Sequence, residues 1–419
     1  MDELSGEALR TLSVAYRPLS GVEDGNAGAA LEQDLIFVGT VGIIDPPRAE
    51  AAQAVREARG AGIRVVMITG DHPRTAARIA TDLGISDAGA TALTGTRLDA
   101  LDDSALANAV RDTSVFARVA PLHKLRIVAA LRAQGHVVAM TGDGVNDAPA
   151  LKAADIGIAM GITGTEVTRE AGDMIVADDN FATIVAAIRE GRSILDNIRK
   201  FLRYLLSSNM GAVLTVFLAV IGARALGLTG DGGAVVLPLL ATRILWINPV
   251  TDAAPSLAMG VDPQTDDVMA RRPRRPDERV IDSRMWWGVL LLGSAMALST
   301  LATLDLLLPG GWFEGAESLE TARTAAFTAL VLAQLFNAFN ARSEAASVLQ
   351  GLFANRWLWA AVALGLALQV AVVELPWLNV AFGTVPLTPG QWGLCVLMGS
   401  VVLWCGELRK FWLRRAFAG

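Results

Sequence analysis

Apolar residues are unevenly distributed along this chain of 419 residues. In residues 1–200, short apolar runs alternate with charged stretches, which predicts the strands and amphipathic helices of a soluble α/β region. In residues 201–419, the apolar blocks are long and carry few charges, as membrane-spanning helices do. Six spans are therefore expected, at about 201–222, 234–258, 285–308, 324–341, 357–375 and 390–408.

The soluble region alternates apolar runs with helical patterns between about residues 36 and 190, which predicts parallel βαβ units. Helices are expected to begin near Pro73 and at His123, and a further helix is expected at 7–16. Strands are expected at 35–39, 63–68, 115–117 and 137–140.

Charge and composition narrow the class of protein. The net charge of −6 argues against nucleic acid as the main partner, because phosphate binding needs a basic surface. Cys395 and Cys405 both lie in the last apolar block, so a disulfide framework is not expected. The acidic start Met1-Asp-Glu-Leu-Ser does not have the pattern of a signal peptide.

Basic residues cluster between the second and third spans, between the fourth and fifth, and after the sixth. By the positive-inside rule, both termini and the soluble half are expected to be cytoplasmic, in a protein of the plasma membrane. The three histidines, His72, His123 and His136, have no metal-binding spacing, and we expect exposed loop positions without a catalytic role for them.

Two carboxylates mark a candidate metal site after the expected strand at 137–140. Asp143 and Asp147 lie four residues apart in a turn that contains glycine. Mg²⁺ prefers oxygen ligands and takes few of them from protein, and ligands of α/β sheets bind beyond the carboxyl ends of strands. The pair therefore predicts a magnesium site.

A candidate phosphate site follows the strand at 63–68, where Thr69-Gly70-Asp71 offers a hydroxyl and backbone amides just before a helix. Lys124, at the start of another expected helix, could neutralise a phosphoryl group as a point charge. A lone lysine is ordinarily a solvated surface residue, but the order Thr-Gly-Asp, Lys, Gly-Asp-x-x-x-Asp favours a functional role.

Polar residues within the spans are expensive in lipid and usually face a bundle interior or an ion path. The second span contains Asn248, Pro249, Thr251 and Asp252, where the proline frees backbone carbonyls and three side chains offer oxygens. A cation site is expected here; a polar patch that binds helices together is the alternative. For Asn209, and for Gln334, Asn337 and Asn340, ion contact and interhelical hydrogen bonding remain equally open.

The run from Met140 to Met160, with Thr-Gly-Asp-Gly-Val-Asn-Asp near its start, resembles the hinge signature of P-type cation-transporting ATPases. The order of the motifs resembles the haloacid-dehalogenase-like phosphotransferase fold. The resemblance implies phosphoryl binding by Thr69 and Gly70, charge neutralisation by Lys124 and Mg²⁺ binding by Asp143 and Asp147. It also implies ATP as cofactor, contacts near the nucleotide for Asp45, Asp71 and Arg118, and support of the Mg²⁺ loop by Asn146.

The expected fold class is a partial haloacid-dehalogenase-like, Rossmann-like parallel sheet followed by a six-helix membrane bundle. Residues 1–40 resemble the end of a nucleotide-binding domain, 41–192 a phosphorylation domain, and 193–419 a cation-transporting domain. No Asp-Lys-Thr-Gly-Thr, Thr-Gly-Glu-Ser, Lys-Gly-Ala or Walker-type segment occurs in these residues. Because the family's nucleophile strand lies in mid-sheet, we expect a gap with unpaired strand edges.

The transported ion is left open by departures from the calcium-pump pattern at three positions. Ala212 stands where two-site calcium pumps carry glutamate, which suggests one cation per cycle. Ca²⁺ is the first choice of ion, ahead of Mn²⁺, Mg²⁺ and Na⁺. Pro249 replaces an aliphatic residue. Arg243 stands where an uncharged residue is usual, either extending toward the membrane surface or acting as a built-in counter-ion.

Three interpretations follow. The chain is the C-terminal part of a P-type pump and inactive alone; or a half-pump that assembles with a chain bearing the nucleophile; or a non-enzymatic membrane scaffold or regulator derived from a pump. Retention of Lys124, Asp143 and Asp147 argues against the scaffold, which would not need them.

Overall fold

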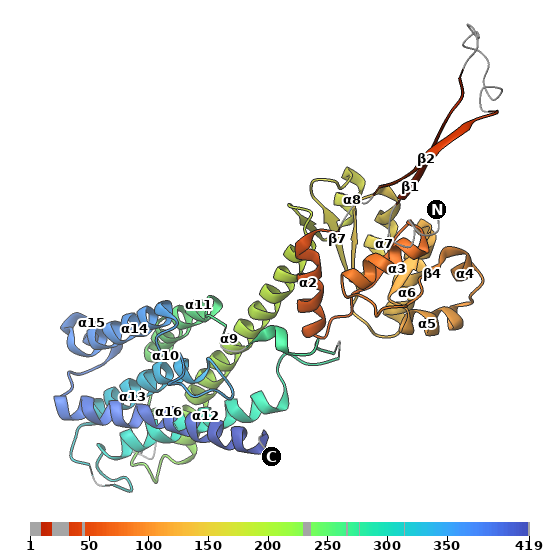
Figure 1. Ribbon diagram of the computed structural model, residues 1–419. Coiled ribbons are helices and arrows are strands. Elements are labelled where there is room, and N and C mark those ends of the chain that lie inside the picture. The colour runs from red at the N-terminus through yellow and green to blue at the C-terminus, as the bar shows by residue number, and fades with distance from the viewer. Residues whose placement is uncertain are drawn as a thin grey trace. The chain divides into compact units, whose positions relative to one another are not determined.

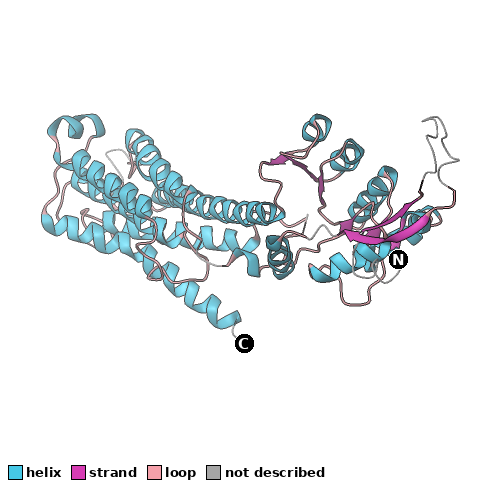
Figure 2. Cartoon of the chain, turned by 45° about the horizontal axis from the view of Figure 1, so that its top comes forward, coloured by secondary structure: helices cyan, strands magenta, loops and turns pink. Residues whose placement is uncertain are grey.

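The computed structural model describes residues 10–18, 33–43, 47–228, 236–264, 267–275, 277–313 and 315–417. The chain divides into two compact units, each described here by itself (Figure 1). Unit 1 comprises Met1–Glu190 and Val268–Asp277, and unit 2 comprises Gly191–Asp267 and Glu278–Gly419. All described strands belong to unit 1, whereas the described regular structure of unit 2 is helical (Figure 2).

Unit 1 contains parallel βαβ structure, as the alternating pattern predicts. Its strands are β1 (Arg10–Tyr16), β2 (Ile36–Ile43), β3 (Met67–Ile68), β4 (Leu93–Thr94), β5 (Val115–Ala117), β6 (Ala139–Gly142), β7 (Ile156–Met160) and β8 (Met174–Val176). Its helices are α2 (Ala49–Gly60), α3 (Pro73–Asp82), α4 (Gly95–Asp99), α5 (Asp103–Asp112), α6 (Pro121–Ala133), η2 (Val145–Asp147), α7 (Ala148–Ala153) and α8 (Glu166–Ala171).

The first parallel sheet has the order β3-β5-β4 and is covered by helices on both faces. Along β5, Val115 and Ala117 pack in a cluster with residues of α2 and α3. Phe116 points to the other face and packs against residues of α4, α5 and α6. This alternation is the period of two that a strand imposes on its side chains. Both faces of β5 are therefore buried.

The second parallel sheet has the order β6-β7-β8. Met140 of β6 packs with Ala150 and Leu151 of α7, and Ile68 of β3 packs against the same cluster. Strands β3 and β6 are thus close neighbours, yet each is an edge of its own sheet, and no ladder joins them among the described residues. These two open edges agree with the gap that the family resemblance implies.

The N-terminal hairpin corrects one expectation. The prediction of a helix at 7–16 is wrong over its described part, because Arg10–Tyr16 is strand β1, paired antiparallel with β2. The segment Arg-Thr-Leu-Ser-Val-Ala-Tyr includes β-favouring residues, and an apolar partner strand outweighs weak helical periodicity. The strand expected at 35–39 is present as Ile36–Ile43.

Unit 2 is a bundle of helices, entered by α9, which begins in unit 1. Its helices are α9 (Phe181–Ile221), α10 (Ala241–Ile247), η4 (Asn248–Ala253), α11 (Ala254–Gly260), α12 (Ser283–Asp305), α13 (Leu319–Asn340), α14 (Arg356–Glu374), α15 (Pro376–Phe382) and α16 (Pro389–Phe417). Among the described residues, five helices are long and apolar enough to cross a membrane: α9, α12, α13, α14 and α16.

The second expected span, at 234–258, is the one that is not a single long helix. It consists of α10, the π-helical turn η4 and α11 in direct succession. Pro249 and Pro255 each lack a backbone N–H, so the regular ladder of hydrogen bonds is interrupted. Six long membrane-spanning helices are therefore not found among the described residues, but the irregular turn falls where the proline is expected to break the helix, on the residues predicted to bind a cation.

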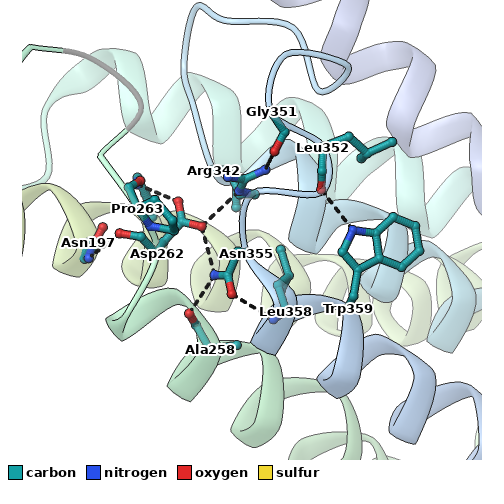
Figure 3. A network of polar contacts seen from close by, with 12 residues as sticks. Asn197, Ala258, Asp262, Pro263, Arg342, Gly351, Leu352, Asn355, Leu358 and Trp359 are labelled. Carbon is teal, nitrogen blue, oxygen red and sulfur yellow. Dashed lines mark hydrogen bonds and ion pairs between the residues drawn. The ribbon is translucent and has the colours of Figure 1, made fainter.

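The C-terminal end of α11 is held by a buried polar network around Asp262 (Figure 3). Its carboxylate accepts from Lys200 Nζ at 2.7 Å, Arg342 Nε at 3.0 Å and Asn355 Nδ2 at 2.9 Å. Asn197 Nδ2 donates to the carbonyls of Gly260 and Asp262, and Asn355 Nδ2 also donates to that of Ala258. These bonds satisfy carbonyls at a helix end and join α11 to α9, the end of α13 and the start of α14.

Replacing Asp262 with alanine should destabilise unit 2 by about 3–5 kcal/mol, because Lys200 and Arg342 would remain buried without their carboxylate. Asp282→Asn is the matched control. It removes an acid paired with Arg199 at a more exposed site but keeps an oxygen to cap α12, and should cost at most about 1 kcal/mol. Unfolding of the full chain in detergent measures both. Equal effects of the two substitutions would contradict a stabilising role for the network.

Candidate functional site

The segment after β3 lies where the sequence predicts phosphate binding. The Thr69 hydroxyl donates to Asp71 Oδ2 at 2.8 Å and accepts from the Asp71 backbone N–H at 3.1 Å. The neighbouring strand β5 ends at the same edge, and the backbone N–H of Arg118 donates to the Asp71 carbonyl at 3.2 Å. Arg118 has a φ of 49°, which turns the chain sharply there. Thr69, Gly70, Asp71 and Arg118 are thus brought together.

Lys124 is held in the first turn of α6, as predicted. The expectation that His123 is an exposed loop residue is wrong, because it is buried in this helix. Its Nδ1 accepts from the backbone N–H of Ala120 at 3.0 Å, and its Nε2 lies 2.7 Å from Asp99 Oδ1. The imidazole therefore fixes the start of α6 and, with it, the position of Lys124. In the sequence, this role of His123 is indicated only by its position directly before Lys124.

Asp143 and Asp147 lie at the carboxyl end of β6. Asp143 is exposed and Asp147 is buried, with an ion pair from Lys124 Nζ to Asp147 Oδ1. A Cβ added to Gly142 would lie 2.5 Å from the Asp147 Cβ and 3.0 Å from its carboxyl carbon. Only glycine at 142 leaves room for this carboxylate against the strand. Asn146 is exposed in η2 between the two acids.

The donors present fit Mg²⁺. Two carboxylates follow a strand end, and the glycine leaves space for one of them, which suits an ion that keeps several waters. The Lys124 ammonium already places a positive charge against Asp147. No group of three or more His, Cys, Asp or Glu side chains arranged for a metal occurs in the described part of the chain. Asp143 and Asp147 are therefore the two carboxylates that could hold the ion at this strand end.

A loop after β7 supports this site. The Asp143 carbonyl accepts from the Thr165 backbone N–H at 3.0 Å and from the Thr168 hydroxyl at 3.3 Å. The preceding residues, Ile162 and Thr163, donate backbone N–H groups to the Asp179 carboxylate at 3.0 and 2.7 Å. The Ile162 N–H is the first of several donors that lower the pKa of Asp179 to about 2.

Asp45, expected near the nucleotide, lies outside the described residues. In unit 2, Asp252 is buried in η4, and its Oδ1 has no hydrogen-bond partner among the described residues. Gln334 and Asn337 of α13 are also buried; Gln334 Nε2 donates to the Ser208 carbonyl at 3.3 Å and Asn337 Nδ2 to the Ser207 hydroxyl at 2.8 Å.

Two apolar clusters of unit 2 flank these polar groups. One cluster includes Ile247, Ala333 and Leu335, and the other includes Ala258 and Ala338. Along their helical segments, Asp252 and Asn337 fall between residues of the two clusters, whereas Gln334 lies within the first cluster, between Ala333 and Leu335. Asp252 and Asn337 are therefore placed at the boundary between the clusters.

Asn209 and Asn248 carry exposed side chains in unit 2, so the structure does not enclose them with Asp252. Thr251 lies in η4 by its backbone, but its side chain, like that of Pro249, is outside the described set. Asn340 is buried and donates from Nδ2 to the Val402 carbonyl at 2.8 Å, which is an interhelical bond from α13 to α16. For Asn340, helix contact is thus the role observed.

Arg243 follows neither of the two roles left open by the sequence. It is only 1% exposed, so it does not extend to the surface. Its Nε donates to the Phe382 carbonyl at 3.1 Å, its Nη2 to the Gly383 carbonyl, and its guanidinium lies over the Phe327 ring at 5.7 Å. Its described contacts are to these groups rather than to Asp252. Arg243 therefore holds α10 to the C-terminal end of α15.

Comparison with known proteins agrees with this arrangement. Residues 17–155 match the family described as haloacid dehalogenase-like hydrolase, and residues 236–412 match cation transporting ATPase, C-terminus. A haloacid dehalogenase-like domain combined with helices able to cross a membrane is characteristic of an integral membrane protein of the ATPase class. The chain corresponds to the C-terminal portion of P-type cation-transporting ATPases.

Individual relatives extend the match over nearly the whole chain. A calcium-transporting ATPase of Bacillus subtilis is 45% identical over 398 residues, which covers 95% of this chain and 43% of that protein. The probable cation-transporting ATPase F of Mycobacterium tuberculosis is 41% identical over 400 residues, covering 93% and 42%. The endoplasmic reticulum calcium ATPase srcA of Aspergillus fumigatus is 37% identical over 420 residues, also covering 93% and 42%. The chain spans less than half the length of these relatives.

Acid should loosen the loop that supports Asp143. Because folding lowers the pKa of Asp179 to about 2 from its usual value of about 3.9, its contribution to stability is complete above pH of about 3.9. The contribution is lost as pH falls toward 2. Hydrogen exchange at Ile162 and Thr163 in the full chain, corrected for intrinsic rates, should accelerate over this range. Asp179→Asn should accelerate exchange at pH 6 and remove this acid step; an unchanged wild-type profile would contradict the assignment.

Proposed function

We propose that this chain forms the phosphotransfer and ion-binding part of an ATP-driven cation pump, with Ca²⁺ as the transported ion. The observation that carries the proposal is the ion pair between Lys124 and Asp147 at the end of β6, in the same unit as the Thr69–Asp71 hydrogen bond at the end of β3. Relatives that bear the name calcium-transporting ATPase support the choice of ion. The alternatives Mn²⁺, Mg²⁺ and Na⁺ are outcomes of the transport test below.

In the proposed reaction, the Thr69 hydroxyl and the backbone N–H groups around Gly70 bind a phosphoryl group. Lys124 neutralises its charge and, through Asp147, keeps the phosphate site next to the metal site. Asp143 and Asp147 would hold Mg²⁺, which supplies electrostatic stabilisation of the phosphoryl oxygens. Asp71, Arg118 and Asp45 are proposed to lie near the nucleotide, ATP, and Asn146 to support the acidic loop.

The aspartyl nucleophile lies outside these 419 residues, according to the family resemblance. We propose that the segment bearing it enters between β3 and β6. Both strands are edges of parallel sheets, and Ile68 of β3 and Met140 of β6 border the same apolar cluster. The segment belongs to the same polypeptide or to a second chain. The scaffold interpretation is less favoured, since a scaffold has no need of the space that Gly142 leaves for Asp147.

In unit 2, Asp252 is proposed as the main charged ligand of the cation, with Asn248, Thr251, Asn209 and Gln334 contributing oxygens. A buried carboxylate oxygen without a described partner in an irregular turn suits a desolvated cation. The arginine-rich segments support placing unit 1 and both termini on the cytoplasmic side of the plasma membrane.

Transport by the assembled pump tests this proposal. In inverted membrane vesicles, Asp252→Asn should weaken the Ca²⁺ dependence of uptake roughly tenfold or more, because one ligand charge is lost. Glu374→Gln, which neutralises an exposed acid at the end of α14, should leave the dependence unchanged. Uptake of another cation in place of Ca²⁺ would reassign the ion, and an Asp252→Asn pump with unaltered ion dependence would refute the assigned site.

A further inference from the structure

A cavity of about 210 Å³ lies in unit 2, away from both proposed sites. It is bordered by Pro263 after α11, by the end of α13 and the segment that follows it, and by Lys410 of α16. The helices α11 and α13 end at the cavity, and Lys410 lies in the C-terminal part of α16, so the cavity is near one end of the bundle. Its size is below the roughly 300–1,000 Å³ of drug-sized pockets, so its occupant is a small group.

The charges that face this cavity have one sign. Arg342 and Lys410 line it, and both are at least nine-tenths buried, whereas no aspartate or glutamate is among its lining residues. The carboxylates that pair with these cations belong to residues outside the lining. Arg342 Nε bonds Asp262 at 3.0 Å, and Lys410 Nζ bonds Glu407 at 3.2 Å. Glu407 also accepts from the lining residues Ser347 at 2.6 Å and Val348 at 2.9 Å, so a ligand meets two paired cations, with no acid among the lining residues themselves.

Neutral hydrogen-bonding groups complete the lining. The Ser343 oxygen accepts backbone N–H groups from Ala345 at 3.3 Å and Ala346 at 2.9 Å, and the Ser347 hydroxyl donates to Glu407 Oε2 at 2.6 Å. Amide side chains of Gln264 and Gln350 also border the cavity. Two charged donors together with hydroxyl and amide donors suit an acceptor-only group with several oxygens.

We propose that this cavity binds a phosphate group. At the end of the spans, such a group is available from the head of an anionic lipid or from phosphate free in solution, and basic pockets between membrane helices are suited to lipid head groups. Phe339 and Val348 in the lining give an apolar flank beside the two cations. This site is independent of the proposed transport reaction.

Calorimetric titration of the full, delipidated chain in neutral detergent tests the proposal with two probes, inorganic phosphate and short-chain phosphatidylglycerol. Short-chain diacylglycerol, which has no phosphate group, is the reference lipid. Saturable binding of phosphatidylglycerol alone would identify a lipid site, whereas binding of inorganic phosphate as well would identify a general phosphate site. Equal binding of both lipids without phosphate binding, or no binding at all, would overturn the proposal.

Variants separate this cavity from other basic surfaces. Lys410→Gln should weaken binding about tenfold, the usual effect of losing one charged hydrogen bond. Ala346→Leu fills the cavity while leaving every charge in place, so it should also weaken binding even if Lys410→Gln disturbs folding. Arg356→Gln removes an exposed cation at the start of α14 that does not line the cavity, and should have no effect. Equal losses in all three variants would contradict a specific site.

Discussion

Backbone hydrogen bonding is the constraint on which the soluble unit depends most. A parallel sheet satisfies its N–H and C=O groups only through neighbouring strands, and exposed edges invite pairing with another segment. Here β3 and β6 are two such edges in one compact unit, and each leads directly into a functional loop. The position of Thr69 relative to Asp143 therefore depends on what occupies the space between the strands. Among the described contacts, the ion pair from Lys124 of α6 to Asp147 joins the two sides of this space.

The membrane unit follows a related rule, in which polar groups out of contact with water need partners. Around Asp262 every donor has a defined acceptor, and the end of α11 is fixed to three neighbouring segments. A few residues earlier in the same helical run, Asp252 keeps an oxygen without a described partner. The hydrogen-bonded network around Asp262 thus lies next to the turn η4, in which an Asp252 oxygen has no described hydrogen-bond partner. This contrast is what distinguishes a structural carboxylate from a candidate ligand, although both are buried acids near one helix.

The sequence predicted the local features well, because each had a local signal. The strand at Val115–Ala117, the helix at Pro73 and the position of Lys124 in its helix are confirmed, and the family that the run from Met140 resembles is confirmed by the comparisons. The features that it missed depend on contacts between distant residues. Lys200, Arg342 and Asn355 lie far from Asp262 in sequence; the charge of Arg342 was interpreted only as an orientation signal, and Lys200 and Asn355 were given no role. Strand β1 forms because β2 pairs with it, and the burial of His123 and Arg243 depends on acceptors from other elements.

The central claim is that an added strand between β3 and β6 completes the phosphate site. Hydrogen exchange of the full chain, alone and coexpressed with the N-terminal portion of the Bacillus subtilis relative, tests it most directly. The account predicts that backbone amides of Met67–Ile68 and Ala139–Gly142 become protected in the complex, while β8 at the far edge of its sheet does not change. Unchanged exchange at both β3 and β6 in a complex that forms would contradict the account.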